Sequence, residues 1–125
     1  MKIAAVIAHV LITLSGTALV VLGILFWTGR ALSLLPLHML LGVILVVSLW
    51  LAAGLALRAG VSKGLILVAV IWSLIMPALG VAQMQLLPGR LHWTVQLLHL
   101  LIGVTAMGLG HALTRRTRLA KPVLA

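Results

Sequence analysis

The chain has 125 residues, of which 64% are hydrophobic, with nine Lys or Arg, no Asp, Glu or Cys, and a formal net charge of +9. This excludes a soluble globular domain, which is about half apolar and roughly a quarter charged. Without side-chain carboxylates, acid/base catalysis by paired carboxylates and hard-cation sites built from Asp or Glu are excluded as well.

The basic residues divide the chain into four uncharged runs of 27, 27, 26 and 24 residues. Each run is longer than the roughly 20 residues that an α-helix needs to cross the hydrocarbon of a bilayer. The sequence therefore predicts an all-α integral membrane protein with a single transmembrane domain over residues 1–125. The four helices are expected at residues 3–27, 32–57, 64–86 and 91–113, followed by a basic tail at 114–125.

Short connections between these helices predict an up-down-up-down bundle. If the N-terminus is cytoplasmic, seven of the nine basic residues lie on that side, and only Arg30 and Arg90 lie outside. We therefore expect both termini in the cytoplasm and a membrane such as the bacterial inner membrane. The basic tail is expected to lie on anionic headgroups of the lipid bilayer. No nucleic-acid partner is expected, because only this short tail would be free to bind one.

The first helix, at 3–27, carries His9 in its inner half. Its apolar run is much longer than the roughly 7–15 residues of a signal-peptide core, so we expect a permanent helix. Glycines at 16 and 23 follow His9 at intervals of seven residues. The three positions form one stripe that points in nearly the same direction.

The second and fourth helices share the pattern L-H-x-L-x-G-V, at residues 37–43 and 98–104. A Gly-Arg pair precedes each copy, so the offset is 60 residues at the turn and 61 at the histidine. This predicts a duplicated helical hairpin whose two copies run parallel. The second and fourth helices are then diagonal in the bundle, where His38 and His99 can face each other across the core.

Gly42 and Gly103 follow these histidines by four residues, which places each glycine on nearly the same helix face as its histidine. A flat macrocycle held between two helices needs such an arrangement, with an imidazole on each side and no side chain where the ring lies. The alternative is a close helix contact through small residues, with the histidines hydrogen-bonded to Ser, Thr or backbone. That alternative does not explain why the same spacing occurs twice.

Histidines on two parallel, diagonal helices, with glycines that open the core, resemble the b-type cytochromes of respiratory membranes. The resemblance covers the architecture of the bundle and includes no long motif. It implies a haem b with His38 and His99 as its axial metal ligands, and a function in electron transport. A redox partner protein or a quinone would exchange the electrons. The protein would then be an electron carrier rather than a self-contained enzyme, as a homodimer or as a subunit of a respiratory complex.

For a second haem the pattern is incomplete. In this family each ligand helix usually carries a further histidine. Here His111 follows His99 by 12 residues, whereas the matching residue of the second helix is Trp50. The other inner histidine is His9, on an adjacent helix. His9 and His111 are therefore the expected ligands of an inner haem, if the protein holds two haems rather than one. The alternative is that both are interfacial residues that contact water and headgroups.

Three further residues belong to the outer rim. Arg30 and Arg90 have no side-chain carboxylate to pair with in this chain, and haem propionates would supply one. Lipid phosphates are the alternative partners. His92 precedes His99 by seven residues and shares its face, so it is an alternative ligand, a propionate partner or a hydrogen-bond donor to a quinone carbonyl.

Two other classes of function remain open. The five histidines and the methionines provide imidazole and thioether groups that suit Cu(I), although no His-Met spacing repeats. A cofactor-free subunit that packs against a larger membrane complex is the third interpretation. Haem, copper and the absence of both would give different absorption spectra.

Overall fold

The structure is a computed structural model that describes residues 1–121, and these residues form helices and short connections. All four long helices are long and apolar enough to cross a membrane, which confirms the predicted all-α membrane class. Two short 3-10 helices, η1 and η2, belong to the connections. The elements are α1 (Lys2–Trp27), η1 (Leu32–Leu34), α2 (Leu35–Arg58), α3 (Lys63–Ala82), η2 (Gln83–Gln85) and α4 (His92–Leu119).

The helix ends differ from the expected bounds mainly in the second half of the chain. α4 continues to Leu119, so most of the described part of the expected tail is helical. Thr114 and Thr117 are buried there, and their hydroxyl groups donate back to the carbonyl oxygens of Gly110 and Leu113. The hydroxyl groups of these two polar residues are thus hydrogen-bonded within the helix although they are buried. Residues 122–125 of the expected tail lie outside the described residues.

α3 ends at Ala82, four residues before the expected end at 86. The chain then forms η2 and a turn in which Leu87 and Gly89 have positive φ values of 43° and 91°. Such values interrupt a helix, because right-handed helical residues have negative φ.

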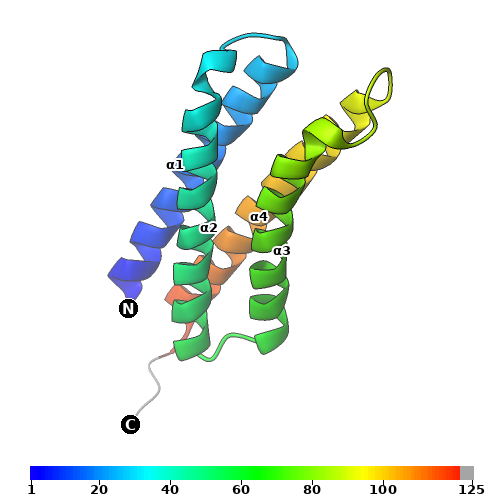
Figure 1. Ribbon diagram of the computed structural model, residues 1–125. Coiled ribbons are helices and arrows are strands. Elements are labelled where there is room, and N and C mark those ends of the chain that lie inside the picture. Colours follow the sequence, from blue (N-terminus) through cyan, green and yellow to red (C-terminus); the bar gives the residue numbers. More distant parts are fainter. Residues whose placement is uncertain (122–125) are drawn as a thin grey trace.

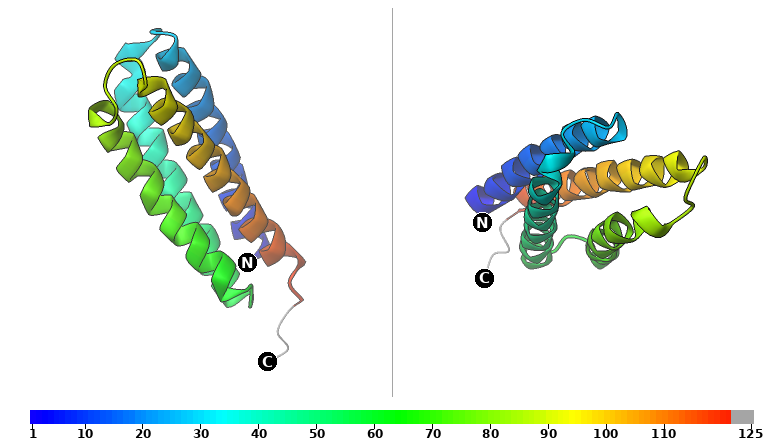
Figure 2. Two further views of the ribbon diagram at one scale, coloured as in Figure 1. Left: turned by 90° about the vertical axis from the view of Figure 1, so that its right-hand side faces the viewer. Right: turned by 45° about the horizontal axis from the view of Figure 1, so that its top comes forward.

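The two ends of the bundle are different (Figure 1). The connections at 28–31 and 86–91 lie together at one end, which we call the loop end. The N-terminus, the connection at 59–62 and the last turns of α4 lie at the opposite end, which we call the terminal end. Figure 2 shows the same arrangement from two further sides.

α2 and α4 are the central pair of the bundle. Each packs against all the other long helices, whereas no Cα atoms of α1 and α3 lie within 8 Å of each other in the described chain. Small residues permit this close approach. At Gly110 of α4 two neighbours leave no room for a side chain, because an added Cβ would lie 2.8 Å from both Ile12 Cδ1 and Leu49 Cδ2. α1, α2 and α4 therefore meet at Gly110.

The buried core is concentrated toward the terminal end. In α2 the buried residues lie between Leu45 and Ala56, and in α4 five of the six buried residues lie at 106–117. The remaining parts of the long helices, 17–27, 35–44, 77–82 and 92–105, form what we call the loop half. Leu22 and Val95 are the only buried residues among the described side chains of this half. Fully buried side chains are therefore much rarer in the loop half than in the terminal half.

Two hydrogen bonds between neighbouring helices follow the offset of the sequence repeat. Thr13 of α1 and His111 of α4 are joined by a contact of 2.9 Å between Oγ1 and Nε2. Trp50 of α2 donates its Nε1 hydrogen to Oγ of Ser73 on α3, also at 2.9 Å. Thr13 and Ser73 are 60 residues apart, and Trp50 and His111 are 61 apart. Under the repeat, the hydrogen bond between α1 and α4 therefore corresponds to the one between α3 and α2.

Candidate functional site

His38 and His99 face each other in the loop half. His38 lies in the first turn of α2 and His99 lies two turns into α4. Their ring centres are 6.4 Å apart and their planes are inclined by 46°. Both side chains are partly buried. The structure thus brings together the two histidines of the repeated pattern, from the two central helices.

Each of these rings has a buried nitrogen with an unmet hydrogen-bonding capacity. The Nδ1 atoms of His38 and His99 are buried, and neither has a hydrogen-bond partner among residues 1–121. A buried polar atom without a partner costs about 1–3 kcal/mol. The arrangement is therefore unfavourable as a purely structural contact, and it favours a site that takes a further binding partner.

Glycines of the neighbouring helices make room for both rings. A Cβ added to Gly80 of α3 would lie 3.0 Å from Cε1 of His99, and one added to Gly23 of α1 would lie 4.0 Å from Cε1 of His38. The sequence pattern predicts Gly23 only as part of a stripe with His9, and it gives Gly80 no role. The sequence does contain a signal for both glycines. Each lies in the last two turns of the helix that precedes α2 or α4, the helices that carry His38 and His99.

Phe26 adds a second contact to His38. Its ring lies edge-on to the imidazole, with the centres 5.3 Å apart and an interplanar angle of 61°. Phe26 is the only phenylalanine of the chain. It restrains the orientation of the His38 ring from the side of α1, because aromatic rings favour such edge-to-face contacts.

Gly42 and Gly103 have a different environment from Gly80. A Cβ added to either would meet no heavy atom of the described chain within 4 Å. They are therefore not points of close helix contact, unlike Gly16, Gly80 and Gly110, whose added Cβ atoms would contact neighbouring side chains. This argues against helix packing within this chain as the reason for the repeated His-to-Gly spacing, and it leaves open space at both glycines.

His9 and His111 form a second pair, in the terminal half between α1 and α4. Their ring centres are 4.5 Å apart and their planes are inclined by 35°. Nδ1 of His9 lies 3.1 Å from Oγ1 of Thr114, and Nε2 of His111 lies 2.9 Å from Oγ1 of Thr13. The four side chains form one polar cluster, which we call the inner cluster.

The threonines of the inner cluster determine which ring nitrogens carry hydrogen. A hydroxyl group has one hydrogen to donate. Thr13 donates it to the carbonyl oxygen of His9, and Thr114 donates to the carbonyl oxygens of Gly110 and His111. Both hydroxyl groups therefore accept from the imidazoles. His9 donates through Nδ1 and His111 donates through Nε2.

Arg30, Arg90 and His92 lie at the loop end. Both arginines are exposed and follow glycines with positive φ, Gly29 and Gly89. Positive φ is a backbone conformation that glycine adopts without strain. Nδ1 of His92 donates to the carbonyl oxygen of Leu86 at 3.2 Å, so this histidine closes the turn before α4. The structure thus gives His92 a contact of its own in that turn.

No group of three or more His, Cys, Asp or Glu side chains that could hold a metal ion is found within the described part of the chain. The two candidate centres are therefore pairs of imidazoles. His38 and His99 have buried nitrogens without partners, whereas His9 and His111 are hydrogen-bonded to threonines.

Comparisons with known proteins do not assign the chain to a family. No protein-family model, no curated protein and no solved structure matches it. The function therefore has to be argued from the geometry of the histidine pairs and from the membrane-spanning fold.

Proposed function

We propose that this protein is an integral membrane b-type cytochrome that holds one haem b between His38 and His99. The observation that carries the proposal is the pair of imidazoles on the two central helices, 6.4 Å apart with unpartnered buried nitrogens. When bound, haem iron supplies one-electron transfer between a donor and an acceptor.

The separation of the rings supports this assignment. Two imidazoles that bind opposite sides of one metal ion, each through a nitrogen about 2 Å from the metal, have ring centres roughly 6 Å apart. His38 and His99 have this separation, at 6.4 Å. The same test gives a different result for the inner cluster, where the rings of His9 and His111 are only 4.5 Å apart. We therefore propose one haem and not two.

Space for a macrocycle is the second support. The loop half has few buried side chains, and the positions beside the two histidines are Gly42 and Gly103, which face open space. A macrocycle between α2 and α4 would contact the apolar side chains of this half. Burial of apolar surface contributes roughly 25 cal/mol per Å². A bound ring would thus stabilise the loop half by burying apolar surface, as the packed side chains already do in the terminal half.

The chain's own residues then have distinct roles. His38 and His99 would bind the iron, while Gly80 and Gly23 leave their rings room on α3 and α1. The packed terminal half would hold α2 and α4 together, so that the two imidazole rings stay close before the cofactor binds. Arg30 and Arg90 are exposed cations at the same end as the histidine pair, where they would interact with propionate groups.

The charges support an orientation in the membrane. We propose that the helices cross the bilayer in up-down-up-down order, as two copies of one hairpin, with the terminal end in the cytoplasm. A bacterial inner membrane is the compartment that we infer. Basic residues prefer the cytoplasmic side. Seven of the nine belong to the terminal end: Lys2, Arg58, Lys63, Arg115, Arg116, Arg118 and Lys121.

With this orientation the haem would lie in the outer half of the membrane. A single haem there does not form a path through the bilayer, because the inner cluster lies at the other end of the bundle. We therefore propose that electrons enter and leave at the loop end, through a quinone or a redox partner protein. A homodimer or a larger respiratory complex would be the setting for such a carrier.

A copper site has less support. Met39 and Met84 are 59% and 77% exposed, and Met107 packs against Gly16 in the terminal half. Met76 is buried in the hydrophobic core cluster. Copper nevertheless remains an outcome that the following experiment can detect.

The experiment is a redox difference spectrum with haem and metal analysis of the purified protein. We expect about one haem per chain and a low-spin spectrum, which His38→Ala and His99→Ala both remove. His9→Ala and His111→Ala are the matched controls, and they should leave the spectrum unchanged. An unchanged low-spin spectrum in His38→Ala would overturn the proposal. So would stoichiometric copper without haem, or a folded protein that takes up neither.

A further inference from the structure

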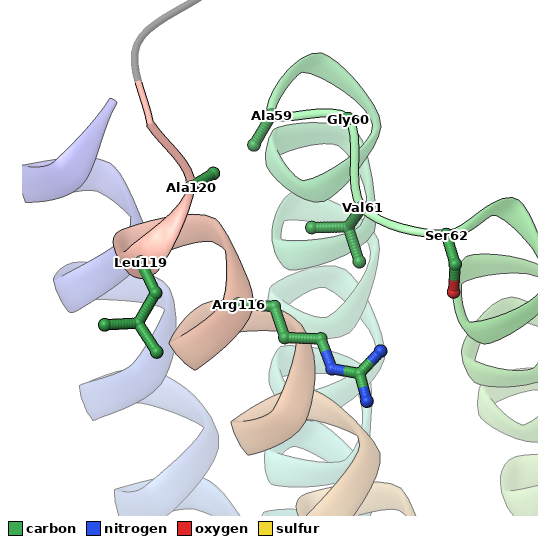
Figure 3. Close-up of a pocket in the computed structure, with 7 residues that line it drawn as sticks. All are labelled: Ala59, Gly60, Val61, Ser62, Arg116, Leu119 and Ala120. Atoms are coloured by element: carbon green, nitrogen blue, oxygen red, sulfur yellow. The ribbon is translucent and has the colours of Figure 1, made fainter.

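A shallow cavity of about 300 Å³ lies at the terminal end, far from the histidine pair of the loop half (Figure 3). Its lining comes from two parts of the chain. The connection at 59–62, between α2 and α3, forms one side. Arg116 and Leu119 at the end of α4, with Ala120 directly after it, form the other. Neither the histidine pair nor the inner cluster contributes to it.

The lining combines one cation with apolar and hydroxyl groups. Arg116 lines the cavity, and its side chain extends from α4 across toward α2 and α3 (Figure 3). The chain has no Asp or Glu, so this cation has no side-chain carboxylate partner. Ser62 is the N-cap residue that precedes α3, and its side chain makes no capping hydrogen bond. Val61 supplies an apolar wall on the side of the connection. The ligand that fits such a lining is anionic at one end and apolar at the other.

The position of the cavity agrees with a lipid. α2 ends at Arg58 and α3 begins at Lys63, so the connection between them lies where two membrane-spanning helices leave the hydrocarbon. This is the depth of the headgroups. We propose that Arg116 and the 59–62 connection bind the phosphate group of an anionic phospholipid, with its acyl chains along the apolar wall. The proposal needs the membrane-spanning fold but does not depend on haem.

The guanidinium geometry distinguishes this site from a general attraction of the basic rim to the membrane. Arginine binds phosphate with two parallel hydrogen bonds. A general electrostatic attraction to anionic lipids, by contrast, requires only a positive charge, which any basic side chain provides. Arg115 provides the matched comparison. It is exposed, has the same charge and is the adjacent residue, but it lies about 100° around the helix and does not line the cavity.

The test measures lipid bound to the intact protein in detergent by native mass spectrometry. Phosphatidylglycerol is titrated against wild type, Arg116→Gln and Arg115→Gln, with phosphatidylcholine as the zwitterionic lipid. We expect one retained phosphatidylglycerol in wild type. Affinity should fall about tenfold in Arg116→Gln, because a charge-assisted bidentate contact is lost, and should change less than about twofold in Arg115→Gln.

A further variant, a comparison lipid and one competition measurement separate a built site from diffuse attraction. Arg116→Lys keeps the charge but not the bidentate geometry, so its affinity should lie between those of wild type and Arg116→Gln. Helical circular dichroism and gel filtration establish that each variant is folded. Equal losses in Arg115→Gln and Arg116→Gln would overturn the proposal, as would equal retention of phosphatidylcholine. Displacement of the lipid by millimolar inorganic phosphate would show that the acyl chains contribute nothing, which also contradicts it.

Discussion

His99 lies directly against the backbone of Gly80, so that a Cβ atom on Gly80 would approach His99 Cε1 to 3.0 Å. The contact is made between α3 and α4, the two helices of the second hairpin. The equivalent contact in the first hairpin, between Gly23 and His38, is looser at 4.0 Å. The absence of a side chain at residue 80 therefore sets the position of one of the two facing imidazoles.

The first prediction follows from this contact. In Gly80→Ala, the added methyl group should push the His99 ring away from α3 and change its distance from His38. We expect haem affinity to fall about tenfold, which corresponds to about 1.4 kcal/mol. The measurement is a haem titration of the purified apoprotein, followed by absorption at the Soret band.

Gly108→Ala is the control for this prediction. Gly108 lies outside the loop half, and its added Cβ would meet no described atom within 4 Å, so this variant should bind haem nearly as well as wild type. Gly103→Leu should behave differently, because its side chain would occupy the volume proposed for the macrocycle and prevent incorporation. If Gly80→Ala binds haem as tightly as Gly108→Ala, the Gly80 contact does not position His99.

The second prediction concerns the point where α1, α2 and α4 meet. An added Cβ at Gly110 would lie 2.8 Å from atoms of both Ile12 and Leu49. Overfilling a packed core costs about 1–3 kcal/mol, so Gly110→Ala should lower the free energy of unfolding by this amount. Equilibrium unfolding in mixed micelles with increasing dodecyl sulfate measures the change.

Gly108→Ala provides the comparison on the same helix. Gly108 is exposed, and no described atom would lie within 4 Å of its added Cβ. Its substitution should be neutral or stabilise by up to about 1 kcal/mol, because alanine favours the helix over glycine. A destabilisation by Gly108→Ala as large as that of Gly110→Ala would refute close packing at Gly110.

The third prediction addresses the inner cluster. Thr114→Val keeps the shape of the side chain but removes the oxygen that accepts from His9 Nδ1. The donor loses its partner, and we expect a loss of about 1 kcal/mol in the free energy of unfolding. The same unfolding assay measures it. The haem spectrum should not change, because the inner cluster lies in the other half of the bundle.

Thr105→Val is the matched variant for Thr114→Val. Thr105 is exposed, and its hydroxyl donates only to the carbonyl oxygen of Leu101 within its own helix. Stability should change by less than about 0.5 kcal/mol, as for ordinary surface substitutions. If the two variants lose the same stability, the interhelical bond between His9 and Thr114 contributes nothing measurable.

The sequence by itself is sufficient for the class of the fold. Four uncharged apolar runs between basic residues predict four long membrane helices, because hydropathy and length are properties of the chain alone. The repeated pattern around His38 and His99 also predicts that these two residues come together, and the structure places their rings 6.4 Å apart. A pattern repeated on two parallel helices places its residues at equal depth, and this can be predicted without knowing how the helices pack.

Only the tertiary structure decided which residues touch these rings and which histidines remain hydrogen-bonded. The sequence pointed to Gly42 and Gly103, but the glycines whose added Cβ atoms would approach the imidazoles are Gly23 and Gly80. The physical reason is that these helices are apolar on nearly every face. Without a polar face to fix it, the rotation of each helix about its own axis cannot be read from the pattern of hydrophobic residues. The packing of small residues between the helices, around Gly16 and Gly110, sets that rotation.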